Sequence, residues 1–456
     1  MRQIFAARWV LPVDAPTIDD GEVVVEDGVI QEVRQHITPA NEVTDLGNAV
    51  LMPGLVNAHT HLEYTALRGF LEDVPFFPWI RTLTAAKAAL DREDWMISAR
   101  LGAAESIASG VTTIGDNTDA GVTAAIAQEF GLRAVVFQEF FGIDPRQERD
   151  AVLNDLRAKL AAAGTYASDR VSLGISPHAP YTVRAELLDA LLAEPDLTPL
   201  RTSIHVAESP AEVSLIREGT GPFAEMFVRR EIPWTVPRVS PTHYLADHGA
   251  VRPGALLVHC VHQDAGDIAL IARTGAAIVH CPKSNAKLGA GIAPLSQWLA
   301  TEGVTVALGT DSAVSNNTLD LFEEMRFALL MARASTQNAV GVTAQDVLRM
   351  ATLGGAAALG LGDITGSLTP GKRADLTAVS LDRLHTHPAT SAEAALVYSA
   401  RADDVVLTVC DGNVLFDRTG TDTARSSSNP HLSHHQLLES AAAVRLKFSR
   451  RQNEQA

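Results

Sequence analysis

Eight short apolar runs, rich in strand-forming residues, constrain the fold of this chain more than any other feature. Helical patterns separate most of them, such as DWMISARLGAAESIAS, which Gly110 closes. Nearly continuous apolar strands alternating with helices are typical of a parallel sheet covered by helices. Eight such repeats over roughly 250 residues predict a TIM-like (β/α)8 barrel, an α/β fold. The runs are LMPGLVNAH (51–59), VTTIGDN (111–117), RAVVFQEF (133–140), RVSLGISPH (170–178), LRTSIHVAE (200–208), ALLVHCVH (255–262), AAIVHCPKS (276–284) and VTVALGTDS (304–312).

The two ends of the chain have a different pattern, which predicts a second, smaller domain. Near the N-terminus, GEVVVEDGVIQEV alternates apolar and polar residues around an Asp-Gly turn. Similar segments return in GKRADLTAVSL and DVVLTVCDGNVLFD, which has an Asp-Gly turn of its own. We expect residues 1–50 and 366–420 to form one small β-sandwich, and residues 51–365 to form the barrel. Residues 421–456 should be a loop and a helix, with His434 and His435 exposed to solvent.

Composition limits the partners and the location of the protein. The 456 residues are 46% hydrophobic and carry a formal net charge of −17, which disfavours nucleic acid as a partner. Three cysteines, an odd and sparse set, indicate a reducing compartment. The N-terminus does not resemble a signal peptide, and no run reaches the ~18 apolar residues of a membrane helix. We therefore expect a cytoplasmic protein with no membrane partner; a homo-oligomer is compatible with this composition.

Polar side chains that can bind metal follow most of the predicted strands. The active site of a (β/α)8 barrel lies at the C-terminal ends of its strands, so these side chains should meet there. In His59-Thr60-His61 the two imidazoles point to the same side of a strand. With His205 and Asp311 they give three imidazoles and one carboxylate, which suit zinc or ferrous iron and leave a position for water. The alternative is that these four residues are unrelated polar side chains at strand ends, which would have to coincide by chance. The strand ends carry His59 and His61 (first), His178 (fourth), His205 and Glu208 (fifth), His259 (sixth) and Asp311 (eighth).

Five longer segments resemble the amidohydrolase superfamily, in particular its deaminase and chlorohydrolase branch. They are PGLVNAHTH, SIHVAE, LLVHCVH, HCPKSNAKLGAGIAP and LGTDSAVSNNTLDLFEEMR. The resemblance implies that the metal ligands are His59, His61, His205 and Asp311. It also implies that Glu208 is the proton-transfer residue and that His259 is the catalytic histidine of the sixth strand.

The same resemblance implies a single divalent ion and a division of roles. Members with two metals carry a bridging lysine or glutamate after the fourth strand, but this strand ends in GISPHAPY, which has neither. One ion is therefore expected, with zinc favoured and ferrous iron as the alternative. Water should attack an electron-poor ring carbon while Glu208 protonates the adjacent ring nitrogen. Asp311 and His259 take the proton of the water, and the amine leaves as ammonia.

Three further residues are candidates for contact with the substrate. Trp79, in the loop after the first strand, could wall a pocket for a flat heterocycle, or it could simply pack. Glu63 could hydrogen-bond the substrate or support a ligand histidine. His178 is a candidate contact with a core or capping role as its rival.

Other histidines and the cysteines are expected to lie outside the site. His262 competes with His259 for the sixth-strand role, but the resemblance favours His259. His280 is expected to be a buried, hydrogen-bonded side chain. Cys260 and Cys281 are expected to be small buried hydrophobic residues rather than ligands.

The substrate class rests on resemblance alone. HTHLE followed by FxxWI, together with IHVAESPAEVSLIREGTGP, is most similar to aminodeoxyfutalosine deaminases of menaquinone biosynthesis. Deaminases of S-adenosylhomocysteine and methylthioadenosine are close behind. Both imply hydrolytic deamination at C6 of a 5′-modified adenosine, a hydrolysis of a C–N bond in a cyclic amidine. A chlorohydrolase acting on a triazine-like ring is one alternative, and a non-catalytic barrel scaffold is another of a different class.

Overall fold

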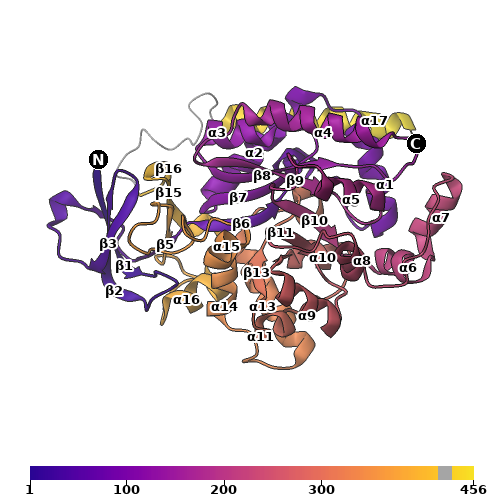
Figure 1. Cartoon of the computed structure of the whole chain (residues 1–456). Coiled ribbons are helices and arrows are strands. Elements are labelled where there is room, and N and C mark those ends of the chain that lie inside the picture. Colours follow the sequence, from indigo (N-terminus) through magenta and orange to yellow (C-terminus); the bar gives the residue numbers. More distant parts are fainter. Residues whose placement is uncertain (420–433, 456) are drawn as a thin grey trace.

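The computed structural model describes residues 1–419 and 434–455, and its larger part is the predicted barrel (Figure 1). Eight parallel strands pair in chain order from β6 to β13. A parallel bridge between Thr60 and Asp311 joins the ends of the first and last strands, so the barrel is nearly closed. The predicted fold class is confirmed. The barrel strands are β6 (Leu55–Thr60), β7 (Val111–Thr118), β8 (Arg133–Phe140), β9 (Val171–Pro177), β10 (Thr202–Val206), β11 (Ala255–His259), β12 (Ala277–His280) and β13 (Thr305–Leu308).

Helices cover the outside of the barrel, and several begin at side chains that cap their free backbone amides. Asp91 and Asp94 form a reciprocal capping box at the start of α2, and Asp264 and Asp267 form another at α9. The helices are α1 (Phe76–Lys87), α2 (Arg92–Ala108), α3 (Thr123–Phe130), α4 (Arg149–Gly164), α5 (Ala185–Ala193), α6 (Pro210–Glu218), α7 (Gly221–Arg229), α8 (Pro241–Asp247), α9 (Ala265–Thr274), α10 (Pro282–Lys287), α11 (Leu295–Ala300), α12 (Ala313–Asn316), α13 (Leu321–Thr336), α14 (Ala344–Arg349), α15 (Gly355–Ala358), α16 (Ala392–Ala394) and α17 (His434–Gln455). Short 3-10 and π segments are η1 (Ala40–Glu42), η2 (Leu62–Leu67), η3 (Met350–Gly354), η4 (Ala395–Ser399) and η5 (Ala402–Asp404).

The strands of the two chain ends form one mixed sheet, as the sequence predicts for a small second domain. Its order is β16-β15-β14-β5-β1-β2-β3, with β4 beside β1. Both Asp-Gly turns are present, with positive φ at Asp27, Gly28, Asp411 and Gly412. The strands are β1 (Arg2–Val10), β2 (Ile18–Glu26), β3 (Val29–Gln35), β4 (Thr44–Asp45), β5 (Ala49–Pro53), β14 (Leu376–Ser380), β15 (Val405–Cys410) and β16 (Asn413–Asp417).

The terminal sheet packs against the barrel beside the N-terminal ends of β7 and β8, away from the expected active site. At the start of β8, Arg133 Nε donates to Asp375 Oδ2 over 2.7 Å, and both side chains are buried. Beside β7, Thr408 Oγ1 donates to the carbonyl of Ile107 over 2.8 Å. The opposite end of the barrel is therefore left free for the site.

The first predicted strand differs in detail from the observed one. Within residues 51–59, the chain leaves β5 of the terminal sheet at Pro53 and enters β6 of the barrel at Leu55. Gly54 lies between them, where a Cβ atom would come within 2.2 Å of the Thr112 side chain. A continuous apolar run thus serves two sheets, because both strands are buried.

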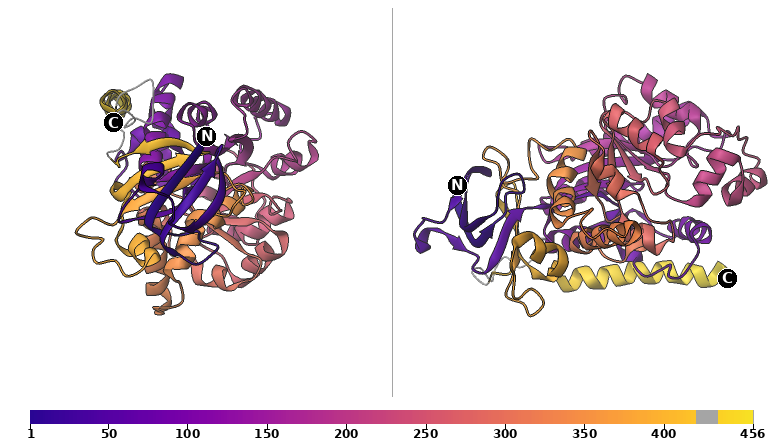
Figure 2. Two further views of the ribbon diagram at one scale, coloured as in Figure 1. Left: turned by 90° about the vertical axis from the view of Figure 1, so that its left-hand side faces the viewer. Right: turned by 90° about the horizontal axis from the view of Figure 1, so that it is seen from below.

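The C-terminal helix α17 lies along the outside of the barrel beside α2, α1 and η2 (Figure 2). Val444 and Ala441 pack against Ala66 of η2, and Lys447 Nζ donates to Asp94 Oδ1 over 2.6 Å. This helix was predicted, and His435 is exposed as expected. The expected loop, 421–433, and the His434 side chain lie outside the described residues. Among the helices of the described residues, none is long and apolar enough to cross a bilayer.

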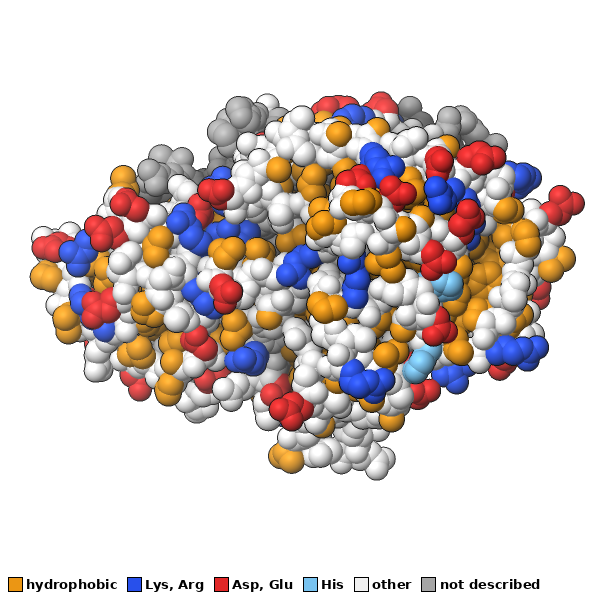
Figure 3. Space-filling model, viewed as in Figure 1, with side chains coloured by type: hydrophobic (Ala, Val, Ile, Leu, Met, Phe, Trp, Pro, Cys, Tyr) orange, Lys and Arg blue, Asp and Glu red, His pale blue; other side chains and the backbone are white. Residues whose placement is uncertain are grey.

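Acidic and basic side chains are scattered over the face of the molecule drawn in Figure 3, without a basic stripe. A recess lined by hydrophobic side chains opens on the right-hand side of this face, beside α7 (Figures 1 and 3).

Candidate active site

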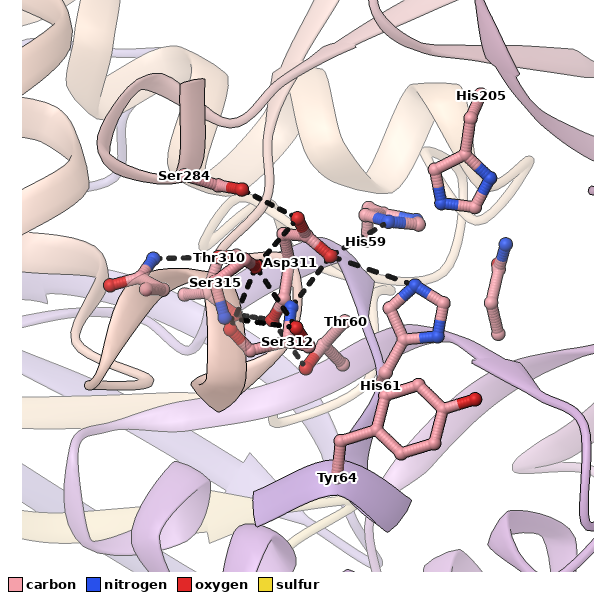
Figure 4. Close-up of polar contacts among 12 residues, drawn as sticks. His59, Thr60, His61, Tyr64, His205, Ser284, Thr310, Asp311, Ser312 and Ser315 are labelled. Carbon is pink, nitrogen blue, oxygen red and sulfur yellow. Dashed lines mark hydrogen bonds and ion pairs between the residues drawn. The ribbon is translucent and has the colours of Figure 1, made fainter. Parts of the chain in front are cut away.

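The four predicted metal ligands converge at the C-terminal end of the barrel (Figure 4). His59 lies near the end of β6, His61 directly follows this strand, and His205 lies in β10. One ring nitrogen of each lies within 4.8 Å of the others. Asp311 follows β13, and its Oδ1 is 3.6 Å from the Nε2 atoms of both His59 and His61. Three imidazoles and one carboxylate from three strands of the barrel therefore face one small space.

Hydrogen bonds from neighbouring segments fix the orientation of these groups. His205 Nδ1 lies 2.8 Å from the carbonyl of His178, so its Nε2 is left for a ligand. Asp311 Oδ2 accepts hydrogen bonds from Ser284 Oγ (2.6 Å) and Ser315 Oγ (2.8 Å), and the Ser312 amide donates to Oδ1 over 2.6 Å. The two serines thus hold Oδ2, and Oδ1, which accepts from the Ser312 amide, is the oxygen that faces His59 and His61.

The donor set fits a divalent cation of the zinc or ferrous type. Both ring nitrogens of His59 and Nδ1 of His61 are buried and have no hydrogen-bond partner among the described residues. Burial lowers the pKa of His59, and it lowers the pKa of His61 and His205 well below 6.5, so the rings are neutral as metal ligands must be. The pKa of Asp311 is well below its usual value: burial opposes this, but contacts with His59 and charge interactions with His259, His59 and His61 outweigh it. A cation at this point would satisfy groups that are otherwise buried without partners.

Glu208 and His259 lie beside the ligand cluster. Glu208 Oε1 is 3.7 Å from His259 Nε2, and burial raises the pKa of Glu208. His259 Nδ1 lies 2.8 Å from Asn285 Oδ1, which can only accept, so Nδ1 carries the hydrogen and Nε2 is free to accept one. His259 has φ of 73° and Asp311 has φ of 59°, left-handed conformations that non-glycine residues rarely adopt and that cluster at functional sites.

A cavity of about 860 Å³ opens directly over this cluster. Trp79 and His178, two of the three predicted substrate contacts, line it. Aromatic side chains form much of the wall, and three arginines and Asp144 lie among the other lining residues. The lining includes Tyr64, Phe76, Phe77, Arg81, Lys87, Asp119, Glu139, Phe141, Asp144, Arg146, Tyr181, Glu208, Phe223, Arg230 and His259.

Glu63, the third predicted contact, does not line the cavity. Its carboxylate accepts hydrogen bonds from Thr118 Oγ1 (2.6 Å) and from the amides of Asp119 (2.9 Å) and Ala120 (3.2 Å). The carboxylate thus ties the segment after β6 to the end of β7. The structure gives the predicted hydrogen bond to the substrate no support.

The remaining sequence candidates lie where the chemistry does not need them. His262 Nε2 lies 2.8 Å from the carbonyl of Ala290, outside the cavity. His280 is buried with its ring 5.5 Å from that of Trp298, but its Nδ1 has no hydrogen-bond partner within the described chain, contrary to the expectation of a hydrogen-bonded side chain. Cys260 and Cys281 are buried and free, as expected.

Sequence reasoning missed the residues that orient the site. Ser284 and Asn285 lie in HCPKSNAKLGAGIAP, and Ser315 lies in LGTDSAVSNNTLDLFEEMR. Both segments resemble the family, but the resemblance predicted no role for these three residues. Glu139 is the last residue but one of the third barrel strand, RAVVFQEF. A rule that searches every strand end for polar residues would have found it.

Comparison with known proteins gives the family. A model of the amidohydrolase family matches residues 50–415. The chain belongs to this family. The predicted family and enzyme class, an amidohydrolase, are confirmed.

Similar proteins cover nearly the whole amidohydrolase chain. A 5′-deoxyadenosine deaminase of Methanothermobacter thermautotrophicus is 34% identical over 406 residues, 88% of this chain and 90% of its own. A 5-methylthioadenosine/S-adenosylhomocysteine deaminase of Halobacterium salinarum is 36% identical over 405 residues, 88% and 89% of the two chains.

Solved structures share the fold. An adenosine deaminase from Xanthomonas campestris, with bound zinc, superposes with a TM-score of 0.85 at 29% identity over 98% of each chain. An aminofutalosine deaminase of Helicobacter pylori superposes with a TM-score of 0.77 at 22% identity, over 91% of this chain and 100% of its own. At that identity the second likeness concerns the fold alone.

Proposed function

We propose that this amidohydrolase is a metal-dependent deaminase that converts the 6-amino group of a 5′-modified adenosine to a 6-oxo group and releases ammonia. One divalent ion, with zinc favoured, is held by His59, His61, His205 and Asp311. The observation that carries the proposal is the convergence of these ligands with Glu208 at the floor of a large cavity. Relatives named as adenosine-type deaminases at 34–36% identity support the substrate class.

The proposed chemistry is a hydrolysis in which the chain moves three protons. A divalent ion at these ligands would supply a water with a pKa lowered toward ~7. Glu208, which burial favours in its protonated form, donates to the ring nitrogen beside the reacting carbon, so negative charge does not build there. His259 Nε2 and Asp311 orient the water and accept its first proton, which passes to the exocyclic amine. The second proton of the water returns to Glu208 as the 6-oxo group forms. The amine leaves as ammonia, and adenosine plus water balances inosine plus ammonia.

The cavity supports a large substituent on the 5′ carbon. Its volume of about 860 Å³ lies near the top of the roughly 300–1,000 Å³ range of small-molecule sites. Arg146 and Arg230 share Asp144 at 2.6 and 3.7 Å, and Arg81, which also lines the cavity, has no ion pair with any described residue, so these four lining residues together carry a net positive charge. This favours a substituent that is partly aromatic and ends in a carboxylate.

Aminodeoxyfutalosine, whose 5′ substituent ends in a benzoate, therefore remains the favoured substrate, and a role in menaquinone biosynthesis follows from it. S-adenosylhomocysteine, which also carries a carboxylate, is second, with methylthioadenosine as its smaller relative. The free, buried state of the three cysteines supports the proposed cytoplasmic location. A non-catalytic scaffold would have no need to keep four ligands and Glu208 together.

The decisive experiment incubates the purified, zinc-loaded protein with aminodeoxyfutalosine, S-adenosylhomocysteine, methylthioadenosine, 5′-deoxyadenosine, adenosine, guanine and a chlorotriazine. Ammonia release and the change in purine absorbance are followed, with Glu208→Gln as the control that keeps the ligands. We expect turnover of the adenine nucleosides, with the highest kcat/KM for a carboxylated 5′ substituent. Absence of turnover with every adenine nucleoside would overturn the proposal, and chloride release from the triazine would favour the chlorohydrolase alternative.

A further inference from the structure

Glu139 is a buried carboxyl group in the cavity wall that the proposed chemistry does not use. It lies near the C-terminal end of β8, lines the cavity and is only 1% exposed. Its Oε1 atom has no hydrogen-bond partner within the described chain. A buried oxygen without a partner is destabilising, and a hydrogen-bond donor on a bound substrate would relieve this.

The neighbours of Glu139 place it on the same wall as His178. One carboxylate oxygen of Glu139, one ring nitrogen of His178 and one of His205 lie within 4.8 Å of one another. His178 Nδ1 lies 2.9 Å from Thr182 Oγ1, which leaves its other nitrogen for the cavity. Glu139 thus lies one side chain away from the ligand cluster, where part of a bound substrate must pass.

A half-buried cation completes this wall. Lys87 Nζ donates to Asp119 Oδ2 over 2.8 Å and to Tyr64 Oη over 2.6 Å, and all three residues line the cavity. The wall therefore offers both hydrogen-bond donors and acceptors, in contrast to the aromatic part of the lining formed by Phe76, Phe223 and others.

The chemistry of a nucleoside decides which of its groups can pair with Glu139. The ring nitrogens of adenine only accept hydrogen bonds, and the exocyclic amine is the group that leaves at the ligand cluster. The sugar hydroxyls remain, and a hydroxyl both donates and accepts. A hydroxyl can therefore hydrogen-bond Glu139 whether the carboxyl group is protonated or not. A ring nitrogen can do so only when the carboxyl group is protonated.

We propose that Glu139 hydrogen-bonds a 2′- or 3′-hydroxyl of the sugar and makes the enzyme specific for ribonucleosides. This rests on the proposed function, because it assumes a nucleoside with its amino group at the ligand cluster. Glu139 then selects the substrate and takes no part in moving protons. The alternative is that Glu139, His178 and His205 bind a second cation. This is disfavoured because His205 is already a proposed ligand of the first ion.

The experiment compares three substrates with three proteins. The substrates are 5′-deoxyadenosine and its 2′,5′- and 3′,5′-dideoxy analogues; the proteins are the parent, Glu139→Gln and Glu208→Gln. Hydrogen bonds to charged or partly charged groups are worth about 1.5–3 kcal/mol, so the parent should lose roughly 10- to 150-fold in kcat/KM when the right hydroxyl is missing. Glu139→Gln replaces a hydrogen bond to a carboxyl group with a weaker one to an amide, so it should lower kcat/KM for 5′-deoxyadenosine roughly fivefold. The dideoxy analogue that lacks the bound hydroxyl should stay near its parent value. Glu208→Gln is the same chemical change elsewhere in the cavity. It should lower kcat/KM by the same factor for all three substrates.

Several outcomes would overturn the proposal. The first is a parent protein that deaminates all three substrates equally well. The second is a Glu139→Gln protein with the same substrate preference as the parent. The third is a Glu139→Gln protein that loses kcat/KM by the same factor for every substrate. The first measurement needs no variant, so the test holds even if Glu139→Gln folds poorly. Two bound zinc ions in the parent and one in Glu139→Gln, measured by elemental analysis, would instead establish the second-cation site. A parent inactive on all adenine nucleosides refutes the proposed function, whereas activity without discrimination refutes only the role of Glu139.

Discussion

Removing one hydroxyl that donates to Asp311 should weaken metal binding, although no proposed metal ligand is substituted. Ser284→Ala deletes the 2.6 Å hydrogen bond to Asp311 Oδ2, and Ser315→Ala deletes the 2.8 Å bond to the same oxygen. Both serines are fully buried, so no solvent water can replace the lost donor freely. In the double variant the carboxylate keeps only the Ser312 amide on Oδ1.

The magnitude follows from the charge of the acceptor. A hydrogen bond to a charged group is worth about 1.5–3 kcal/mol, which corresponds to roughly 10- to 150-fold in an equilibrium constant. Partners behind metal ligands typically change metal affinity by about 10- to 100-fold. We therefore expect a 10- to 100-fold weaker zinc affinity for Ser284→Ala and a larger loss for the double variant, with kcat per bound zinc less affected.

The assay is competition for zinc against a chromophoric chelator of known affinity. The matched control is Ser109→Ala, which removes a buried hydroxyl that donates to the carbonyl of Ser106 over 2.9 Å, far from the ligands. It should lower the melting temperature without changing zinc affinity. If the serine double variant bound zinc as tightly as the parent while losing as much stability as the control, the reasoning would be refuted.

Four further outcomes are expected. Asp311→Ala should lower kcat/KM by roughly 10³-fold or more, since it removes a metal ligand and a proton acceptor together, and activity equal to the parent would contradict the mechanism. Arg81→Ala should reduce kcat/KM about 2- to 5-fold for carboxylated substrates and leave 5′-deoxyadenosine unchanged, because an exposed ion pair contributes little. Val444→Asp places a charge at a 1% exposed site of α17, so limited proteolysis should release this helix and KM should rise. Chelation of the metal should lower the melting temperature, and restoring zinc at 100 times its Kd should return about 2.7 kcal/mol.

The barrel could be predicted because its physics is visible along the chain. A strand buried on both faces must be apolar throughout, and each of the eight runs had a barrel strand in it. The convergence of the proposed ligands could be predicted because strand ends fix where His59, His205 and Asp311 go. The same reasoning failed at Gly54, where the chain passes from the terminal sheet to the barrel. The sequence is apolar on both sides of this residue, and only its close contact with Thr112 marks where one strand ends and the next begins.

The orienting groups could not be predicted in the same way. Ser284 and Glu139 are polar residues beside apolar runs, like many surface residues. Whether such a side chain turns inward depends on loop geometry and on what it meets there, which no local pattern encodes. Glu63 shows the same limit: it follows His59 and His61 closely in sequence, but no local pattern indicates that amides just after β7 bind its carboxylate.

The position of Asp311 connects the closure of the barrel with the assembly of the site. Its backbone amide donates to the carbonyl of His59 over 3.0 Å, and the bridge to Thr60 joins the first and last strands at the same point. The carboxylate can therefore reach the histidines only when β6 and β13 meet. A left-handed residue costs on the order of 1–3 kcal/mol, so the φ of 59° at Asp311 needs this closed seam to hold it. A cation shared by His59, His61 and Asp311, as proposed, would add a bond across the seam, so we expect metal binding and barrel closure to stabilise each other.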